Sequence, residues 1–195
     1  MAANNDPSCV KKCKEQANIL LQRNATVSLA WRMDMAELFE RFVQHVVQKS
    51  IKGLSGIIVP NHKIHGYGNI PNWGLKYLEP DVMVRFGQFL LMADAKYKSN
   101  MYALYERSNE LKETHRADLH QLLAYCSFEP QKNKLGLLLY PCYKFETRQY
   151  SYCESFGGMK NKVILCGVPF THEINIVNES VEMIKTIIQQ ELLKS

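Results

Sequence analysis

Two acidic side chains and one amine stand in the middle of the chain at a spacing that can build a metal site. Asp81 opens a predicted strand over Pro80–Phe86, and Asp94 lies near the end of a second predicted strand over Phe89–Lys98. The residues between these strands, Gly87-Gln88, are typical of a tight hairpin turn. In a hairpin centred there, the numbers of paired residues sum to about 175, as 81 and 94 do. The two carboxylates are therefore predicted to face each other.

Opposed side chains on paired strands have Cβ atoms about 5 Å apart, and two like charges at that distance repel. A divalent cation relieves this repulsion, and carboxylate oxygens are preferred ligands of Mg²⁺. Lys96 lies two residues beyond Asp94 and so points to the same face of the strand. Its ammonium could orient or help activate a water and stabilise charge on a phosphate. The backbone carbonyl of Ala95 is a further candidate ligand.

An ordinary structural role is the alternative for each of these residues. Asp81 could cap the end of a strand, and Asp94 and Lys96 could form a charge pair at the rim of a sheet. The spacing P-D-x(12)-D-x-K is by itself a weak signal. The functional interpretation gains weight because Asp94 follows the apolar run Phe-Leu-Leu-Met-Ala, where a charge needs a partner or a function.

Helices and strands that could position these residues are predicted on both sides of the hairpin. A helix over 34–50 has apolar residues at intervals of three and four, with Asp34 and Glu37 placed as an N-terminal cap. Before it, a short amphipathic helix is predicted over 9–23. Residues 52–74 are rich in Gly, Pro and Asn and predict one or two strands with long turns.

After the hairpin, the patterns predict a helix, three strands and a last helix. The first helix covers 114–128 and ends at Glu129-Pro130. The strands cover 134–140, 147–155 and 162–168, and the last helix covers 180–193. This order predicts an α/β fold in which a central mixed sheet is flanked by helices. One domain over 31–195, preceded by an N-terminal helical extension over 1–30, is the expected organisation.

Composition restricts the class of protein without deciding the function. The 195 residues are 46% hydrophobic, which argues against wholesale disorder. No apolar run reaches the roughly 18 residues of a membrane span, and the first residues do not resemble a signal peptide, so a cytoplasmic protein is expected. The net charge of +5 permits nucleic-acid binding without requiring it. The six cysteines lack the paired spacing of a zinc site and are expected to be reduced, partly buried thiols.

Four blocks of sequence resemble one known family. They are Met35–Val43, Pro80-Asp81-Val82, Leu91–Lys98 and Asp118–Tyr125. In this order they are similar to the McrC family, the nuclease subunit of the 5-methylcytosine-specific McrBC restriction system. The resemblance implies a PD-(D/E)XK restriction-endonuclease-like fold for the domain over 31–195.

The resemblance also implies a role for each matching residue. Asp81 and Asp94 would be metal ligands, Lys96 would orient the water or act as an electrophile, and Glu40 would add a carboxylate from its helix. Gln121 and Tyr125 match the Q-x-x-x-Y element of related RecB-type nucleases. The alternatives are a solvated helix charge for Glu40, and a surface amide with a core aromatic for Gln121 and Tyr125.

Five further residues are candidate phosphate contacts, although a solvated face is the stronger expectation for each of them. These residues are Lys98, Arg107, His115, Arg116 and His120.

The function that the resemblance implies is hydrolysis of DNA phosphodiester bonds by an Mg²⁺-dependent endonuclease, with Mn²⁺ as a substitute. Implied partners are DNA, a McrB-like AAA+ GTPase and a second copy of the chain for double-strand cleavage. Two alternatives stay open: a RecB-like exonuclease or repair domain, and a non-catalytic DNA-binding assembly subunit. McrC-like proteins carry a substantial region ahead of the nuclease domain, where this sequence has about 30 residues. The chain is therefore expected to be either a fragment or a stand-alone relative.

Overall fold

The structure is a computed structural model that describes residue 15 and residues 34–98, 109–129, 133–153 and 160–194. Asp34–Ser195 forms one compact unit, and the description below concerns this unit. The helix predicted over 9–23 lies, apart from Glu15, outside the described residues, as do most of the predicted extension over 1–30 and Arg107.

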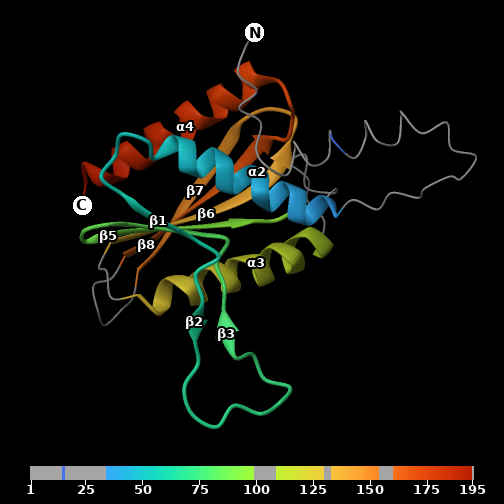
Figure 1. The fold of residues 1–195 in the computed structure, drawn as a ribbon, viewed down its shortest axis with the longest axis vertical. Helices are drawn as coiled ribbons and strands as arrows, with labels where there is room; N and C mark the ends of the chain where they lie inside the picture. Colours follow the sequence, from blue (N-terminus) through green and yellow to red (C-terminus); the bar gives the residue numbers. More distant parts are fainter. Residues whose placement is uncertain (1–14, 16–33, 99–108, 130–132, 154–159, 195) are drawn as a thin grey trace, which may run out of the picture. The chain divides into compact units, whose positions relative to one another are not determined.

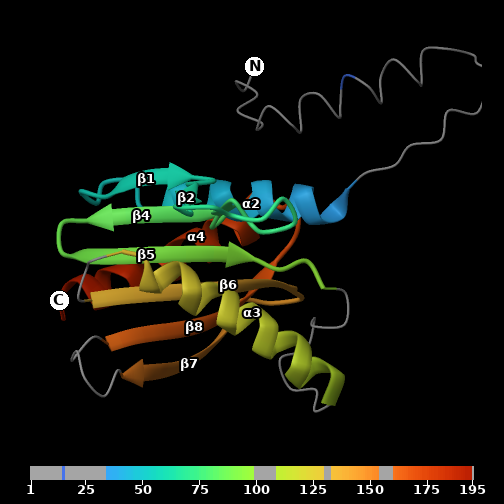
Figure 2. The ribbon, with the colours of Figure 1, turned by 90° about the horizontal axis from the view of Figure 1, so that it is seen from below.

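The centre of the unit is a six-stranded mixed sheet with the strand order β1-β4-β5-β6-β8-β7 (Figures 1 and 2). The strands are β1 (Ile57–Pro60), β4 (Val82–Phe86), β5 (Phe89–Ala95), β6 (Asn133–Cys142), β7 (Glu146–Cys153) and β8 (Lys160–Pro169). The pairs β5–β6 and β6–β8 are parallel and the other pairs are antiparallel. The predicted mixed sheet is thus confirmed.

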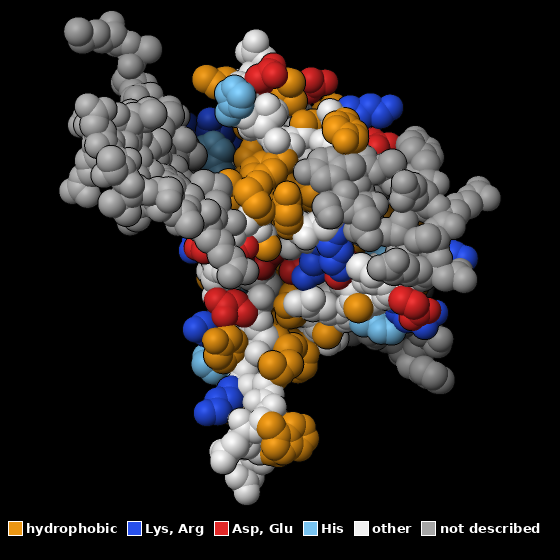
Figure 3. Space-filling view, turned by 90° about the vertical axis from the view of Figure 1, so that its right-hand side faces the viewer, with side chains coloured by type: hydrophobic (Ala, Val, Ile, Leu, Met, Phe, Trp, Pro, Cys, Tyr) orange, Lys and Arg blue, Asp and Glu red, His pale blue; other side chains and the backbone are white. Residues whose placement is uncertain are grey.

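Two short strands, β2 (Ile64–His65) and β3 (Tyr77–Leu78), form a separate antiparallel pair. They belong to a segment between β1 and β4, residues 61–78, which we call the arm. The arm extends away from the sheet as a narrow projection (Figures 1 and 3). The sequence patterns predict strands and long turns in this region but not a projection.

Helices cover both faces of the sheet. Helices α2 (Met35–Ser50) and α4 (Ile174–Leu192) lie on one face, and α3 (Asn109–Ser127) lies on the other (Figure 1). Helix α2 begins as predicted, because the Asp34 carboxylate accepts hydrogen bonds from the backbone N–H groups of Ala36 (2.9 Å) and Glu37 (3.2 Å). Within the described residues, no helix is long and apolar enough to cross a membrane.

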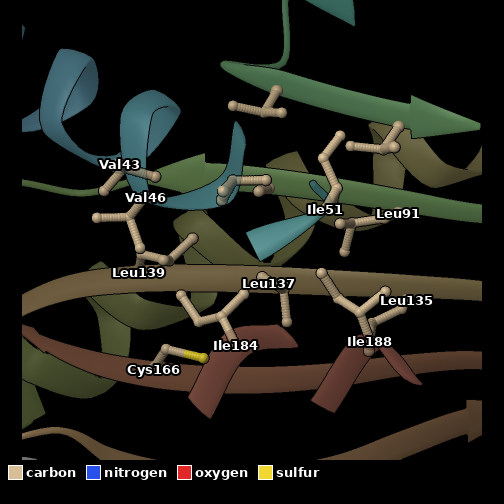
Figure 4. Packing of buried hydrophobic residues seen from close by; sticks show 14 of the residues in the cluster. Val43, Val46, Ile51, Leu91, Leu135, Leu137, Leu139, Cys166, Ile184 and Ile188 are labelled. Carbon is tan, nitrogen blue, oxygen red and sulfur yellow. The ribbon is translucent and has the colours of Figure 1, made fainter. Parts of the chain in front are cut away.

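Strand β5 is buried on both faces, as its apolar sequence predicts. Leu91 and Ala93 point into the larger core under α2 and α4, part of which is drawn in Figure 4, while Leu90 and Met92 point into the core under α3. Because side chains alternate along a strand, Asp94 continues the row of Leu90 and Met92. The fold therefore directs Asp94 toward the face that α3 covers.

Two helices are longer than predicted at their N-terminal ends. Helix α3 begins at Asn109 rather than near Thr114, and α4 begins at Ile174 rather than near Ser180. Cys126 and Cys166 are buried free thiols, and the buried Cys142 thiol donates a hydrogen bond to Glu146 (3.1 Å). The expectation of reduced thiols is confirmed for Cys126 and Cys166.

Candidate functional site

The β4–β5 hairpin has the predicted register. Val82 pairs with Ala93 and Phe86 with Phe89, so the next residues beyond the ladder at its open end are Asp81 and Asp94. Met83 and Met92 both belong to the core under α3, and side-chain alternation places Asp81 and Asp94 on the same face. The two carboxylates thus lie on one face, at the end of the sheet where β5 finishes.

Asp94 is a nearly inaccessible carboxylate, with 1% of its surface exposed. The Lys96 ammonium lies 2.6 Å from its Oδ2 atom and forms an ion pair with it. Even so, no donor among the described residues, Lys96 included, meets hydrogen-bond geometry with this oxygen. Burial raises the pKa of Asp94, and Lys96 offsets only part of this effect, while the charges of Asp118 and Glu40 add to it.

Asp81 is held by the backbone of the neighbouring strand. Its Oδ2 atom accepts a hydrogen bond of 2.7 Å from the Ala95 N–H. Burial, and then the charge of Asp94, raise the pKa of Asp81 to about 7, against the lowering effect of the Ala95 bond. Because a strand residue directs its N–H and C=O to the same neighbouring strand, the Ala95 carbonyl also faces the side of Asp81.

Glu40 reaches this end of the sheet from α2. Its Oε1 atom accepts hydrogen bonds from the side-chain amides of Asn61 (2.9 Å) and Gln44 (3.0 Å). Gln44 also donates to the Asp81 backbone carbonyl (3.3 Å), and Asn61 N–H donates to the same carbonyl (3.1 Å). Glu40 contributes to the raised pKa of both aspartates. It is therefore an electrostatic neighbour of the pair and not a fully solvated helix charge.

Asn61 is a site residue that sequence reasoning missed. It has a positive φ of 49° and sits directly after β1, at the first root of the arm. Asparagine tolerates this left-handed conformation better than most residues. The only signal in the sequence is an asparagine after a short strand and a proline, and many turns contain that combination.

Gln121 and Tyr125 act as one unit on α3. The Lys96 ammonium donates to Gln121 Oε1 (2.9 Å), and the Gln121 amide donates to the Tyr125 hydroxyl. Tyr125 is buried in the core under α3, and burial raises its pKa to about 12. Tyr125 is therefore a core aromatic residue, and it also contacts Gln121.

A second polar network joins α3 to the sheet beside the aspartates. Buried Asp118 accepts hydrogen bonds from the Lys98 ammonium, at 2.7 Å to each oxygen, and from the Tyr140 hydroxyl at 3.0 Å. His115 contacts Tyr140 (3.4 Å) and Tyr150 (3.0 Å), and burial lowers its pKa. Neither Lys98 nor His115 lies on a solvated face, so that expectation was wrong for both. Arg116 and His120 are exposed as expected, and Arg116 pairs with Glu113 (3.1 Å).

The candidate site offers oxygen atoms that could hold a cation. In the part of the chain that the structure describes, no group of three or more His, Cys, Asp or Glu side chains is placed to hold a metal ion. The candidate site offers instead two carboxylates, of which Asp94 is buried with the Lys96 ammonium at 2.6 Å, and the Ala95 carbonyl. Mg²⁺ is commonly bound by one or two carboxylates while it keeps several waters. The two carboxylates and the carbonyl are oxygen donors of the kind that Mg²⁺ takes.

Comparison with known proteins gives a family and a fold. A family model described as "McrBC 5-methylcytosine restriction system component" matches residues 14–141. A chain in the solved half-complex of a tetradecameric assembly of Thermococcus gammatolerans McrB AAA+ hexamers with bound McrC is similar in structure, with a TM-score of 0.51 and 17% identity. The similarity covers 81% of this chain and 34% of that chain, so this chain spans about a third of the length of the solved chain. No curated protein matches.

Proposed function

Because the chain belongs to the family of McrBC 5-methylcytosine restriction system components, we propose that it is a metal-dependent DNA endonuclease with a PD-(D/E)XK centre formed by Asp81, Asp94 and Lys96. The observation that carries this proposal is the buried Asp94. It lies next to the last residue of an apolar strand, shares a face with Asp81, and has an amine at 2.6 Å. A fold gains nothing in stability from two adjacent, partly desolvated carboxylates, and such perturbed pairs cluster at functional sites.

In the proposed reaction, Asp81, Asp94 and the Ala95 carbonyl would hold Mg²⁺, and Glu40 would add a further carboxylate directly or through water. When bound, the ion would supply charge neutralisation at the phosphate and a water of lowered pKa. The Ala95 N–H fixes the Asp81 carboxylate. Asn61 and Gln44 fix Glu40 in the same way. The chain thus orients its acidic groups before a substrate arrives.

Lys96 would act on the substrate side of this centre. Its ammonium is held between Asp94 and Gln121, and Tyr125 in turn anchors Gln121. From this position the amine would orient the attacking water and stabilise the charge that develops on the phosphate oxygens. The bond that breaks is the P–O bond to one deoxyribose, and water supplies the new P–O bond and the proton for the leaving oxygen.

The proposal extends to partners. The similar solved chain comes from an assembly of McrB AAA+ hexamers with bound McrC. We therefore propose a McrB-like AAA+ GTPase as the partner of this chain, and a second copy of the chain for cleavage of both strands. A RecB-like exonuclease is the second candidate, because Gln121 and Tyr125 form the linked pair that the Q-x-x-x-Y resemblance implies.

Removal of the central charges tests the nuclease function. In Mg²⁺, the purified chain should nick supercoiled plasmid, and Asp94→Asn or Lys96→Ala should lower the rate by at least about 100-fold. Binding of labelled DNA should persist in both variants, and circular dichroism checks that each is folded, because Lys96→Ala leaves the buried Asp94 without its ion-pair partner. Glu113→Gln, which removes an exposed carboxylate on α3, should leave cleavage unchanged. Normal nicking by Asp94→Asn and Lys96→Ala would show that this centre does not carry the activity.

Linear DNA, tested beside the closed plasmid, separates an endonuclease from an exonuclease. An endonuclease cuts covalently closed circles, whereas an exonuclease degrades only DNA with ends. Binding of DNA with no cleavage of either substrate, with and without a McrB-like partner, would instead favour the non-catalytic assembly subunit.

A further inference from the structure

The arm, residues 61–78, is rooted directly at the candidate site. Its first residue, Asn61, bonds to Glu40 and to the Asp81 backbone. Its last residue, Leu78, packs against the core under α3 and is followed by Glu79, Pro80 and Asp81. Both ends of the arm are therefore fixed within a few residues of the proposed metal ligands.

The arm has its own internal packing. Ile64 pairs with Leu78 and His65 with Tyr77, and Gly66 N–H donates to the Lys76 carbonyl (3.0 Å). At the tip, the Ile70 side chain packs directly against Gly66 and Gly74, where an added Cβ would come within 2.8 and 2.9 Å of it. A small folded loop of this kind presents its outer side chains in defined positions.

The outer side chains of the arm include aromatic and basic residues, and one aliphatic residue, Leu75, is also exposed. Tyr67 is 96% exposed and Trp73 is 89% exposed. The Lys63 ammonium lies 4.5 Å from the centre of the Tyr77 ring, and Lys76, directly before β3, is exposed. The sequence of the arm also contains two histidines and no aspartate or glutamate. Figure 3 shows hydrophobic and basic side chains along the projection.

We propose that the arm is a DNA-binding element that contacts the DNA strand next to the phosphate that is cleaved. In this proposal Lys63 and Lys76 contact phosphates, and Trp73 and Tyr67 stack on exposed bases. The proposal rests on the nuclease function above, which would bring DNA to Asp81 and Asp94.

Charge and chemistry favour DNA over a protein partner for this surface. A segment with two lysines and no acidic residue complements a polyanion, and its salt-dependent binding comes from released counterions. Aromatic side chains that lack burial in their own fold can stack on the π-faces of bases, an interaction worth several-fold to about 100-fold in affinity per base. The Lys63–Tyr77 contact holds one cation beside an aromatic ring, so the two kinds of contact lie together.

Binding without cleavage tests the arm independently of the nuclease function. In the full chain carrying Lys96→Ala, with EDTA present, Trp73→Ala should weaken binding of a fluorescein-labelled single strand roughly tenfold or more by anisotropy. Lys63→Gln with Lys76→Gln should lower the slope of log affinity against log salt by about 1.4 for a single strand. In a Trp31→Phe background, Trp73 is the only tryptophan, and its fluorescence should be quenched by the strand.

Phe128→Ala is the matched control. Phe128 is an exposed aromatic (60%) that follows α3, next to Glu129, which pairs with Arg85 at the hairpin end of the sheet opposite Asp94. Its replacement should leave affinity unchanged. Equal binding by the wild-type arm and the Trp73→Ala arm, together with no quenching of Trp73, would overturn the proposal. These measurements do not depend on cleavage. If the chain binds DNA through the arm but has no nuclease activity, the proposed function is refuted and the proposal for the arm stands.

Discussion

At the scale of single residues, the fold keeps two carboxylates where their ionised forms are disfavoured. Asp94 is buried, and Asp81 stands beside it with its pKa raised to about 7. Among the residues that the structure describes, Lys96 is the cation whose charge opposes those of Asp81, Asp94 and Glu40 at the two aspartates. Ionisation of these carboxylates therefore lowers the stability of the folded protein. Residues that serve a function often reduce stability in this way.

This argument gives a prediction for the pH dependence of stability. Because the folded protein has the higher pKa at Asp81, it binds a proton there more tightly than the unfolded chain. The stabilisation is complete below the ordinary pKa of 3.8 and is lost as the pH rises through about 7. Asp81→Asn stays neutral and retains an acceptor for the Ala95 N–H. Relative to this variant, the wild-type free energy of unfolding should fall by about 1–3 kcal/mol between pH 4 and pH 8, allowing for partial solvent screening.

Urea unfolding in EDTA at several pH values measures this difference. Glu113→Gln, which changes an exposed carboxylate, serves as the control and should follow the wild type. If the difference between wild type and Asp81→Asn is the same at pH 4 and pH 8, Asp81 does not titrate as described.

The positions of individual residues of the candidate site were predictable from the sequence where a strand pattern determines them. Asp81, Asp94 and Lys96 follow from the hairpin turn and from alternation along β5. Asn61 and the buried role of Asp118 were not predictable. Each depends on a tertiary contact, Asn61 with Glu40 and Asp118 with Lys98 and Tyr140, and no local pattern encodes such a contact.

At the scale of elements, α3 positions Gln121 through close packing on β6. Gly136 lies opposite Met92 in the sheet, and a Cβ added there would come within 2.5 Å of the Leu122 side chain. Glycine therefore lets α3 approach the sheet, and Leu122 is the immediate neighbour of Gln121 in the chain.

Gly136→Ala should move Leu122 and with it the residue that holds Lys96. We expect a loss of about 1–3 kcal/mol in the free energy of unfolding and a reduced cleavage rate in the fraction that remains folded. In a Leu122→Ala background the same change should cost less, because the clashing atoms are gone. A double-mutant cycle by urea unfolding measures the coupling, and strictly additive effects would contradict the contact.

Element boundaries were predictable only where apolar residues mark a buried face. Helix α2 was located well because its stripe packs on the sheet. The first turns of α4 were missed because Asn175 and Asn178 favour turns over helix interiors, although Val177 continues the apolar stripe and packs against the core. The start of α3 was missed because Lys112 and Glu113 are charged and exposed. The strand order was beyond the sequence, because parallel pairing of β5, β6 and β8 depends on crossovers.

At the scale of the whole molecule, the proposed cation should stabilise the folded state. A ligand that binds only the folded protein adds about 2.7 kcal/mol at a concentration 100-fold above its Kd. For a domain of this size, Mg²⁺ at pH 8 should then raise the Tm by roughly 5–10 °C. Asp94→Asn should show little response in the same thermal scan. A matched concentration of NaCl controls for ionic strength, and an equal response of wild type and variant would place the ion elsewhere.

The arm is inserted between two strands that pair with each other, and its ends are pinned by β1, β4 and Asn61. The length and outer residues of this insertion can therefore change without a shift in the β1–β4 register or in the position of Asp81. If the candidate centre cleaves DNA and the arm binds it, as proposed, substrate preference and hydrolytic chemistry become separable traits in evolution or in engineering. Exchanging the arm between relatives would then alter which DNA is bound, while the candidate site stays unchanged.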